Sequence, residues 1–393
     1  MFRITAYIAI FFLFFHLTAL SFDTPAGLNS ALKSASEGEV VELGFTHPGA
    51  FNILNRGTDV LQDAGGSLFY SDDPETVEEY GILYQDSLNA GNNRVYLYHV
   101  NGLSASAKIS AVIHNIGEET ANVTITRKSL PAPSTNYCLV GRAAGKLFYD
   151  NIAMPQPFTI GAGETVLFDP ELDALSVSQN QLVSALYDFT SDQPTRITSL
   201  MLPSGADTLE QFASLGFSEN DGLGRQGTFP SNSRISPEPY PYKTSDGIKV
   251  FEIASNPKYT SYDLPIAGLD AESGEATVLP GNFAVTYTIQ VNVTSDDGRS
   301  MALLMNPRGG AYGGYFRTTF PLKNHPEGIL VPESSLVVAN TAEAGIIALI
   351  EPASEPQLLT LDFMPAGSSS LPIHILMVPF TPEPVKKCGW VMY

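Results

Sequence analysis

The sequence predicts an all-β protein of two related antiparallel β-sandwiches in tandem, because its second half repeats the pattern of its first. Residues 98–115 match residues 289–306: in each, an apolar run ends in Val-Asn, and a second run after a turn ends in Asn. Residues 182–202 match residues 345–363, where two apolar runs flank a Gln-Pro or Glu-Pro pair. Short apolar runs between turn residues are typical of strands. Each half is therefore expected to fold as one sandwich.

Composition and charge favour the same class and narrow the choice of partners. The chain has 393 residues, which favours two or three domains over a single core. It contains 33 Gly and 28 Pro, and only 16% of its residues are charged, as expected for short strands joined by turns. The formal net charge is −20, from 41 acidic and 21 basic residues. Because nucleic-acid binding needs clusters of Lys and Arg, this composition excludes a nucleic acid as partner.

The N-terminus has the pattern of a secretory signal peptide, expected at residues 1–21. Arg3 supplies a positive charge, residues 4–20 are almost wholly apolar, and small residues precede the expected cleavage point. An uncleaved membrane anchor is the alternative, because the apolar stretch approaches spanning length. No later segment is long and apolar enough to span a bilayer. The sequence therefore predicts an extracellular or cell-surface protein with no membrane span after cleavage.

A leader and the first sandwich follow the signal. Residues 22–66 are mixed, with a short helix expected at 28–35, and we expect this leader to pack on the first sandwich. The first sandwich is expected at residues 67–203. Within it, residues 121–126 alternate in the way typical of a half-buried strand. Residues 159–168 are typical of a hairpin around a Gly-rich turn.

A linker is expected at residues 204–245, which are rich in Gly, Ser and Pro. Alternate prolines at 237–241 favour an extended polyproline conformation and cannot join the interior of a sheet. We therefore expect a stiff spacer there. The second sandwich is expected at residues 246–380, followed by a C-terminal tail at 381–393.

Two cysteines, Cys138 and Cys388, remain after the signal. In an oxidising compartment two thiols commonly pair. A bond between them would attach the C-terminal tail to the first sandwich. The alternatives are a free Cys388 near the end of the chain or a bond between two chains.

No motif in the chain indicates catalysis, a metal or a cofactor. His99 and His114 lie on expected strands without the additional Cys or His that a zinc or copper site needs. Residues 141–146 resemble a phosphate-binding loop, but the loop is one residue short and Leu147 stands where Ser or Thr is required. A serine-hydrolase elbow is also missing. With 41 acidic residues, any two carboxylates can be nominated as a catalytic pair, so such a pair is not informative.

The most distinctive string, residues 306–317, is the candidate ligand-binding loop. Its four glycines permit close approach to another surface. The string also contains two arginines and two tyrosines, whose side chains can stack on or hydrogen-bond a glycan or a peptide. The candidate ligand-binding residues are therefore Arg308, Tyr312, Tyr315 and Arg317. The alternative is a wide connection between strands whose aromatic residues cover a sheet edge.

Three strings resemble segments of secreted, largely uncharacterised tandem β-sandwich proteins of Gram-positive bacteria. They are residues 80–84, 227–230 and 302–310, and the resemblance covers roughly residues 68–379. It implies a cell-envelope or extracellular setting and a tandem β-fold. Some relatives carry a copper amine oxidase-like N-terminal domain, which has no equivalent in this sequence. The resemblance therefore transfers neither copper chemistry nor a catalytic residue.

Taken together, the sequence predicts a secreted, non-catalytic protein that acts in binding or adhesion at the cell surface, with a glycan or an envelope component as ligand. One alternative is an extracellular carbohydrate-active enzyme with acidic residues in a cleft between the sandwiches. Another is a structural envelope protein that associates with itself. The sequence does not determine the oligomeric state.

Overall fold

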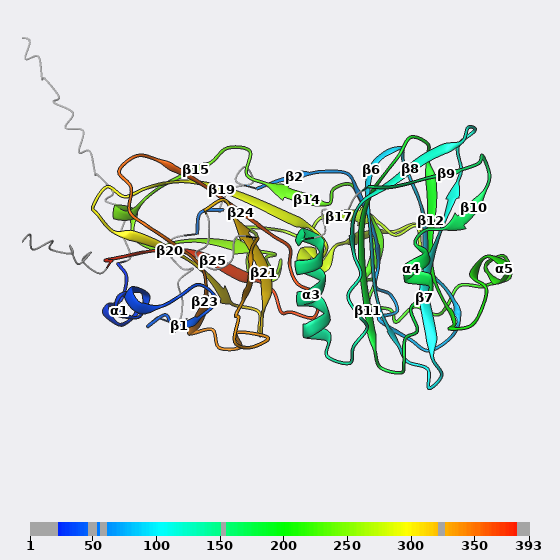
Figure 1. The fold of residues 1–393 in the computed structure, drawn as a ribbon, viewed down its shortest axis with the longest axis horizontal. Coiled ribbons are helices and arrows are strands. Elements are labelled where there is room, and N and C mark those ends of the chain that lie inside the picture. The colour runs from blue at the N-terminus through cyan, green and yellow to red at the C-terminus, as the bar shows by residue number, and fades with distance from the viewer. Residues whose placement is uncertain (1–22, 46–52, 56–60, 151–154, 321–326, 383–393) are drawn as a thin grey trace, which may run out of the picture.

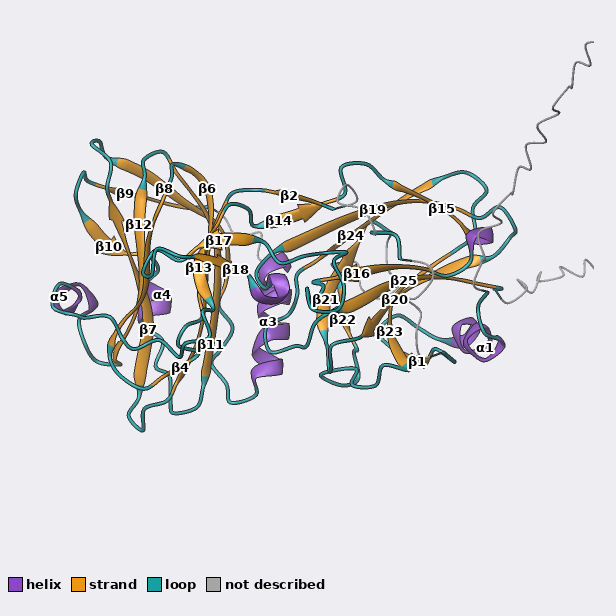
Figure 2. Ribbon diagram, turned by 180° about the vertical axis from the view of Figure 1, so that it is seen from behind, coloured by secondary structure: helices purple, strands orange, loops and turns teal. Residues whose placement is uncertain are grey.

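The protein consists of two β-sandwiches side by side, with helix α3 (Tyr137–Asp150) between them (Figures 1 and 2). Strands make up most of its regular structure, which confirms the all-β class. The computed structural model describes residues 23–45, 53–55, 61–150, 155–320 and 327–382. Within these residues, no helix is both long enough and apolar enough to cross a membrane.

The first sandwich packs a large sheet against a four-stranded one. The large sheet has the order β18 (Ala276–Val278), β17 (Ala267–Leu269), β13 (Gln226–Phe229), β3 (Ser67–Ser71), β6 (Gly91–Asn101), β11 (Leu182–Ser191), β8 (Ala121–Ser129) and β9 (Gln156–Ile160), with β4 (Thr76–Val77) also beside β6. The small sheet has the order β10 (Thr165–Leu167), β7 (Ala107–Asn115), β12 (Thr195–Pro203) and β5 (Gly81–Leu88). Two short helices, α4 (Pro170–Asp173) and α5 (Thr208–Phe212), complete it.

The second sandwich is built in the same way. One sheet has the order β2 (Gln62–Ala64), β14 (Ser233–Ile235), β19 (Thr286–Thr294), β24 (Gln357–Phe363), β21 (Gly314–Thr318) and β22 (Ile329–Val331), with β15 (Tyr240–Lys243) also beside β19. The other has the order β1 (Val40–Glu42), β23 (Glu343–Ile350), β20 (Ser300–Pro307), β25 (Ile373–Phe380) and β16 (Lys249–Ile253). Single 3-10 turns, η1 (Thr244–Asp246) and η2 (Pro280–Asn282), lie in its connections.

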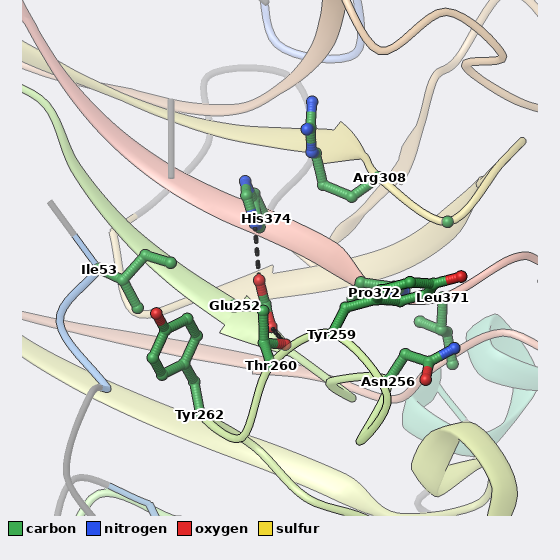
Figure 3. Close-up of a pocket in the computed structure, with 11 residues that line it drawn as sticks. Ile53, Glu252, Asn256, Tyr259, Thr260, Tyr262, Arg308, Leu371, Pro372 and His374 are labelled. Atoms are coloured by element: carbon green, nitrogen blue, oxygen red, sulfur yellow. Dashed lines mark hydrogen bonds and ion pairs between the residues drawn. The ribbon is translucent and has the colours of Figure 1, made fainter. Parts of the chain in front are cut away.

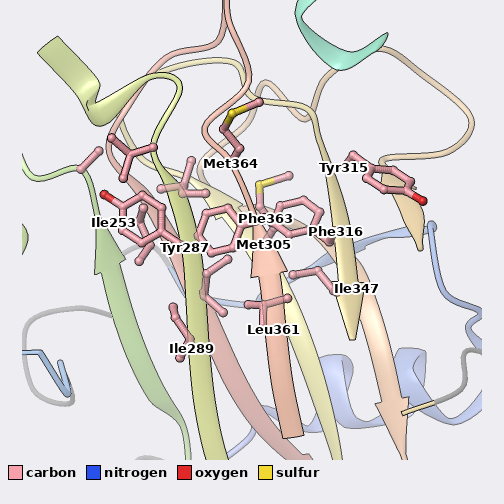
Figure 4. Packing of buried hydrophobic residues seen from close by; sticks show 14 of the residues in the cluster. Ile253, Tyr287, Ile289, Met305, Tyr315, Phe316, Ile347, Leu361, Phe363 and Met364 are labelled. Carbon is pink, nitrogen blue, oxygen red and sulfur yellow. The ribbon is translucent and has the colours of Figure 1, made fainter. Parts of the chain in front are cut away.

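Strict alternation places the apolar face of β19 in the core of the second sandwich. Every second residue from Tyr287 to Val293 is buried, and the residues between are half-buried, as a period of two requires. Tyr287 stacks on Phe363 of the neighbouring strand with ring centroids 5.1 Å apart, and Phe316 lies 5.4 Å from the same ring (Figure 4). Cross-strand aromatic pairs of this kind stabilise the sheet and its register.

The strand pairing of the two sandwiches follows one scheme. The series β3, β6, β11, β8, β9 corresponds to β14, β19, β24, β21, β22, and β10, β7, β12, β5 corresponds to β23, β20, β25, β16. Even the parallel pairs agree, since β3 runs parallel to β6 and β14 parallel to β19. The equivalent of β11 is therefore β24, which corrects the expected match of residues 182–202 with residues 345–363. A common origin of the two halves remains a prediction.

Two asparagines occupy equivalent positions in this scheme. Asn115 ends β7 and Asn306 lies near the end of β20, and both are fully buried. The Asn115 amide donates to the carbonyls of Glu119, Ile160 and Gly161, and the Asn306 amide to those of Thr341 and Glu343. Asn115 thereby satisfies backbone carbonyls in the segment that leads into β10, the strand paired with β7. Asn306 does the same where the chain enters β23, the strand paired with β20.

The leader packs on the second sandwich, which corrects the expectation that it would pack on the first. Strand β1 pairs with β23, and β2 pairs with β14. Helix α1 (Ala26–Ser34) places Leu28 and Leu32 against Leu304 and Leu376 on the outer face of the β20–β25 sheet. Because the leader covers most of this outer face and the sandwich core covers the inner one, β20 and β25 are buried throughout, and so their sequences are largely apolar.

Residues 204–245 are not a spacer, so this prediction was wrong. They contribute β13 to the first sandwich and β14 and β15 to the second. In β15, Pro241 pairs with Asn292 in a short parallel ladder outside the main strand path, where a missing N–H is tolerated. The β17–β18 hairpin likewise returns from the second half of the chain to the large sheet of the first sandwich. The two sandwiches therefore exchange strands.

Helix α3 was not expected from the sequence, and it contains the string at 141–146 that resembles a phosphate loop. Its Cys138 thiol donates to the carbonyl of Ser368 at 3.5 Å. Cys388, like the expected signal peptide at 1–21 and most of the tail, lies outside the described residues. The bond between Cys138 and Cys388 remains a prediction.

The position of α1 predicts that Leu32→Ala destabilises the protein. Leu32 is 1% exposed, and truncating a buried leucine costs about 2–5 kcal/mol. The matched control is Leu209→Ala in α5, where the side chain is 44% exposed and the expected change is below about 0.5 kcal/mol. Urea unfolding followed by circular dichroism measures both. Equal stabilities of the two variants would contradict the docking of α1.

Candidate functional site

A cavity of about 570 Å³ opens in the second sandwich beside β16 and β25. Such a volume lies within the range of small-molecule sites. Figure 3 shows its lining side chains, which come from both strands, from the loops after β16 and β20, from the segment just before β25 and from the leader. Its polar lining residues are Glu252, Asn256, Tyr259, Thr260, Tyr262, Arg308 and His374.

A buried acid–imidazole pair lies at the centre of this cavity. Glu252 of β16 and His374 of β25 are directly opposite in the antiparallel ladder, so their side chains share one face. Glu252 Oε2 lies 3.2 Å from His374 Nε2, and the two side chains are 6% and 5% exposed. The other oxygen, Oε1, accepts from Ser255 Oγ at 2.7 Å and from Thr260 Oγ1.

These contacts keep Glu252 ionised. Burial alone would raise the pKa of its carboxyl, but hydrogen bonds from His374, Thr260 and Ser255 outweigh burial and hold the pKa below its ordinary value. The backbone beneath it is also fixed: Asn55 Nδ2 donates to the Glu252 carbonyl at 2.6 Å, and the Glu252 N–H donates to Asn55 Oδ1 at 3.0 Å. The Glu252 carboxylate is therefore a negative charge held in one position beside Nε2 of His374.

His374 is a neutral imidazole with its acceptor directed away from Glu252. Burial lowers its pKa below the ordinary value, and the bond to Glu252 only partly offsets this. A neutral imidazole has one N–H, and the ionised carboxylate places that hydrogen on Nε2. Nδ1 is then an acceptor; it is buried and has no hydrogen-bond partner among the described residues. Figure 3 shows Arg308 on the side of the ring opposite Glu252.

Close backbone packing brings Arg308 to the cavity. The N–H groups of Arg308 and Gly309 both donate to the Pro372 carbonyl, at 3.1 and 2.9 Å. A Cβ atom at Gly309 would lie only 1.8 Å from the Leu371 carbonyl oxygen, so only glycine permits this approach. Burial lowers the pKa of Arg308, and the charge of Glu252 acts in the opposite direction. At the rim, the Tyr259 side chain is 73% exposed.

A second buried network fixes the loop that carries Asn256, Tyr259 and Thr260. Asp263 closes this loop and is 3% exposed. Its Oδ2 accepts from the Ala254 N–H at 2.6 Å and from the Tyr287 hydroxyl at 2.7 Å, while its Oδ1 pairs with the Arg234 guanidinium. Because the charge is fully bonded, the loop is held at both ends, and the rim of the cavity is preorganised.

Of the four residues predicted to bind a ligand, the structure brings only Arg308 to this cavity. Tyr312 is fully buried and Tyr315 is 2% exposed, so neither ring forms a binding surface, which corrects that expectation. The Tyr315 hydroxyl donates to Asp150 of α3 at 2.7 Å, and the Arg317 guanidinium lies 5.8 Å from the Tyr149 ring centroid. The end of the Gly-rich string, at Tyr315 and Arg317, thus packs against α3.

Glu252 and His374 were missed because they are 122 residues apart and neither belongs to a local motif. Only the pairing of β16 with β25 brings them together. Elsewhere, the buried His99 is an ordinary strand residue whose ring bonds Ser71 Oγ and the Pro74 carbonyl, both at 2.8 Å. The described residues include no group of three or more His, Cys, Asp or Glu side chains able to hold a metal ion.

Comparison with known proteins does not assign a function. The sequence matches no protein-family model and no curated protein. Among solved structures, YhaK from Escherichia coli is 13% identical, with 81% of this chain and 92% of that chain covered and a TM-score of 0.14. Vicilin from tomato is 10% identical, with 79% and 83% covered and a TM-score of 0.13. Oxalate decarboxylase from Lactobacillus farciminis is 11% identical, with 82% and 88% covered and a TM-score of 0.13. TM-scores this low support no conclusion about function.

The geometry predicts the protonation state of His374. Nitrogen chemical shifts of the labelled ring should show hydrogen on Nε2 alone at pH 7 and a titration midpoint below 6.5. In Glu252→Gln the midpoint should fall further, because the carboxylate that favours the charged ring is gone. Hydrogen on Nδ1, or a midpoint at or above 6.5 in the unaltered protein, would contradict this arrangement.

Proposed function

We propose that this chain is an exported, non-catalytic binding protein that holds an acidic sugar residue of an extracellular or cell-surface glycan in the cavity at Glu252 and His374. The observation that carries the proposal is the combination, in one cavity, of the buried acceptor His374 Nδ1 and the guanidinium of Arg308. The export and the envelope setting are supported by the apolar N-terminal sequence and by the resemblance to secreted Gram-positive proteins.

The chemistry of the lining fits an acidic sugar. The planar guanidinium of Arg308 matches a carboxylate, to which it can donate two parallel hydrogen bonds. His374 Nδ1 accepts a hydrogen bond, and a sugar hydroxyl donates one. The exposed ring of Tyr259 at the rim offers an apolar face for the C–H side of a sugar ring. A ligand with one anionic group and neighbouring hydroxyls therefore uses each part of the cavity.

Charge restricts the ligand further. The net charge of −20 repels extended polyanions, while screening at physiological salt limits this repulsion to about 8 Å. Inside the cavity, the charges of Arg308 and the ionised Glu252 balance each other. Outside the lining, Lys258 Nζ lies 5.4 Å from the ring centroid of Tyr259. These charges favour a single carboxylate within a mostly neutral glycan over a densely charged polymer.

Substitution of Arg308 should weaken binding selectively. With oligosaccharides that contain uronic acid, Arg308→Gln should raise the dissociation constant at least tenfold in isothermal titration calorimetry, since about 1.4 kcal/mol of ion-pair energy suffices for that change. The matched control is Arg196→Gln, an exposed arginine on β12 of the first sandwich, which should bind like the unaltered protein. Equal affinities of the two variants would rule out Arg308 as the carboxylate ligand.

The acid–imidazole pair also supports a second candidate, hydrolysis of a glycan by a water molecule that His374 activates. The specific observation is that Glu252 orients the ring and leaves Nδ1 as a base. Release of reducing ends from an acidic glycan by the unaltered protein, abolished in His374→Gln, would establish the enzyme. Binding without release supports the non-catalytic function.

A further inference from the structure

A second cavity, of about 330 Å³, lies where the two sandwiches meet. On the first sandwich, Tyr70 of β3 and Tyr96 and Tyr98 of β6 line it together with Asp72. On the second, Phe283 and Ser368 face them. No part of this cavity belongs to the site at Glu252 and His374, and residues from both sandwiches are needed to form it.

The three tyrosines form a row of rings at the cavity, and the hydroxyls of Tyr70 and Tyr98 form hydrogen bonds there. Tyr96 and Tyr98 are two residues apart on one strand and therefore share a face, with ring centroids 6.0 Å apart. Tyr70 on the neighbouring strand lies 5.1 Å from Tyr96. The Tyr70 hydroxyl donates to Asp72 Oδ2 at 3.2 Å, and the Tyr98 hydroxyl bonds Ser368 Oγ across the junction.

Asp72 leaves an acceptor unused beside these rings. The residue is 6% exposed, and its Oδ1 has no hydrogen-bond partner among the described residues. A buried acceptor without a partner costs free energy, which a ligand hydroxyl in this cavity would recover. Burial also raises the pKa of Asp72 well above its usual range, as expected for a carboxyl with too few donors.

The charges around this cavity exclude an anionic ligand. Arg225 is the basic residue of the lining, and its guanidinium is shared by three carboxylates: it lies 3.7 Å from Asp72, 3.5 Å from Glu75 and 2.6 Å from Asp221. Acidic groups therefore outnumber basic ones here, in contrast to the cavity at Arg308. Aromatic rings combined with hydroxyl and carboxyl acceptors are suited to a neutral ligand with many hydroxyls.

We propose that the junction cavity is a separate binding site for a neutral sugar residue, with Asp72 Oδ1 accepting from a sugar hydroxyl and Phe283 covering the ring from the second sandwich. The site does not depend on the proposed function of the cavity at Glu252 and His374. Because the ligand touches both sandwiches, binding should stabilise the whole chain against unfolding in proportion to ligand concentration.

The test combines calorimetry and thermal unfolding with neutral probes: glucose, galactose, N-acetylglucosamine and their β-linked disaccharides. At least one should bind the unaltered protein and raise its unfolding temperature. Phe283→Ala and Tyr98→Phe should each weaken that binding at least tenfold, whereas Arg308→Gln should leave it unchanged. Two variants are used so that one remains informative if the other does not fold, as judged by circular dichroism.

The outcomes separate the two sites. Loss of neutral-sugar binding in a folded junction variant, with acidic-sugar binding retained, supports the proposal, and so does retention of neutral-sugar binding in Arg308→Gln. Absence of both heat and stabilisation for every neutral probe overturns it. Unchanged affinity in both folded junction variants overturns it as well, since the sugar would then bind elsewhere.

Discussion

A buried arginine connects the two sandwiches and fixes their relative position, on which the junction cavity depends. Arg94 of β6 is 3% exposed, and its guanidinium pairs with Asp188 at 2.6 Å. Its remaining donor, Nη1, bonds the carbonyls of Asn232 and Ala284, both at 2.7 Å and both in the second sandwich. A buried cation without such partners is strongly destabilising. The first sandwich alone therefore cannot supply acceptors for every N–H group of Arg94, and the second sandwich supplies the rest.

Helix α3 completes the junction through close packing. A Cβ atom at Gly141 would lie 1.9 Å from the Gly367 carbonyl oxygen, so the helix touches the second sandwich backbone to backbone. The next residue of the helix, Arg142, donates hydrogen bonds to the carbonyls of Pro332 and Ser335 and so holds the helix against the second sandwich. The largest apolar cluster consequently runs without interruption from the large sheet of the first sandwich into the core of the second. Ser368, which lines the junction cavity, follows Gly367 in this contact, and its carbonyl accepts a hydrogen bond from Cys138 of α3.

The sequence predicted the strands far better than their partners. Alternation identified segments such as residues 121–126, but short edge strands such as β1 carry no signal for the sheet they join, so the leader was placed on the wrong sandwich. The glycines drew attention to Arg308, whereas the burial of Tyr312 follows from packing that a linear pattern does not contain. The pair of Glu252 and His374 depends on the register of two distant strands, and register is a property of the folded sheet.

The junction makes the two sandwiches one cooperative unit and holds the junction cavity in place. Differential scanning calorimetry of the full chain tests this cooperativity most directly, by comparing the calorimetric and van't Hoff enthalpies of unfolding. The account predicts a single transition with equal enthalpies, lowered in temperature when Arg94 is replaced by Met. Two resolved transitions in the unaltered protein, one for each sandwich, would contradict it.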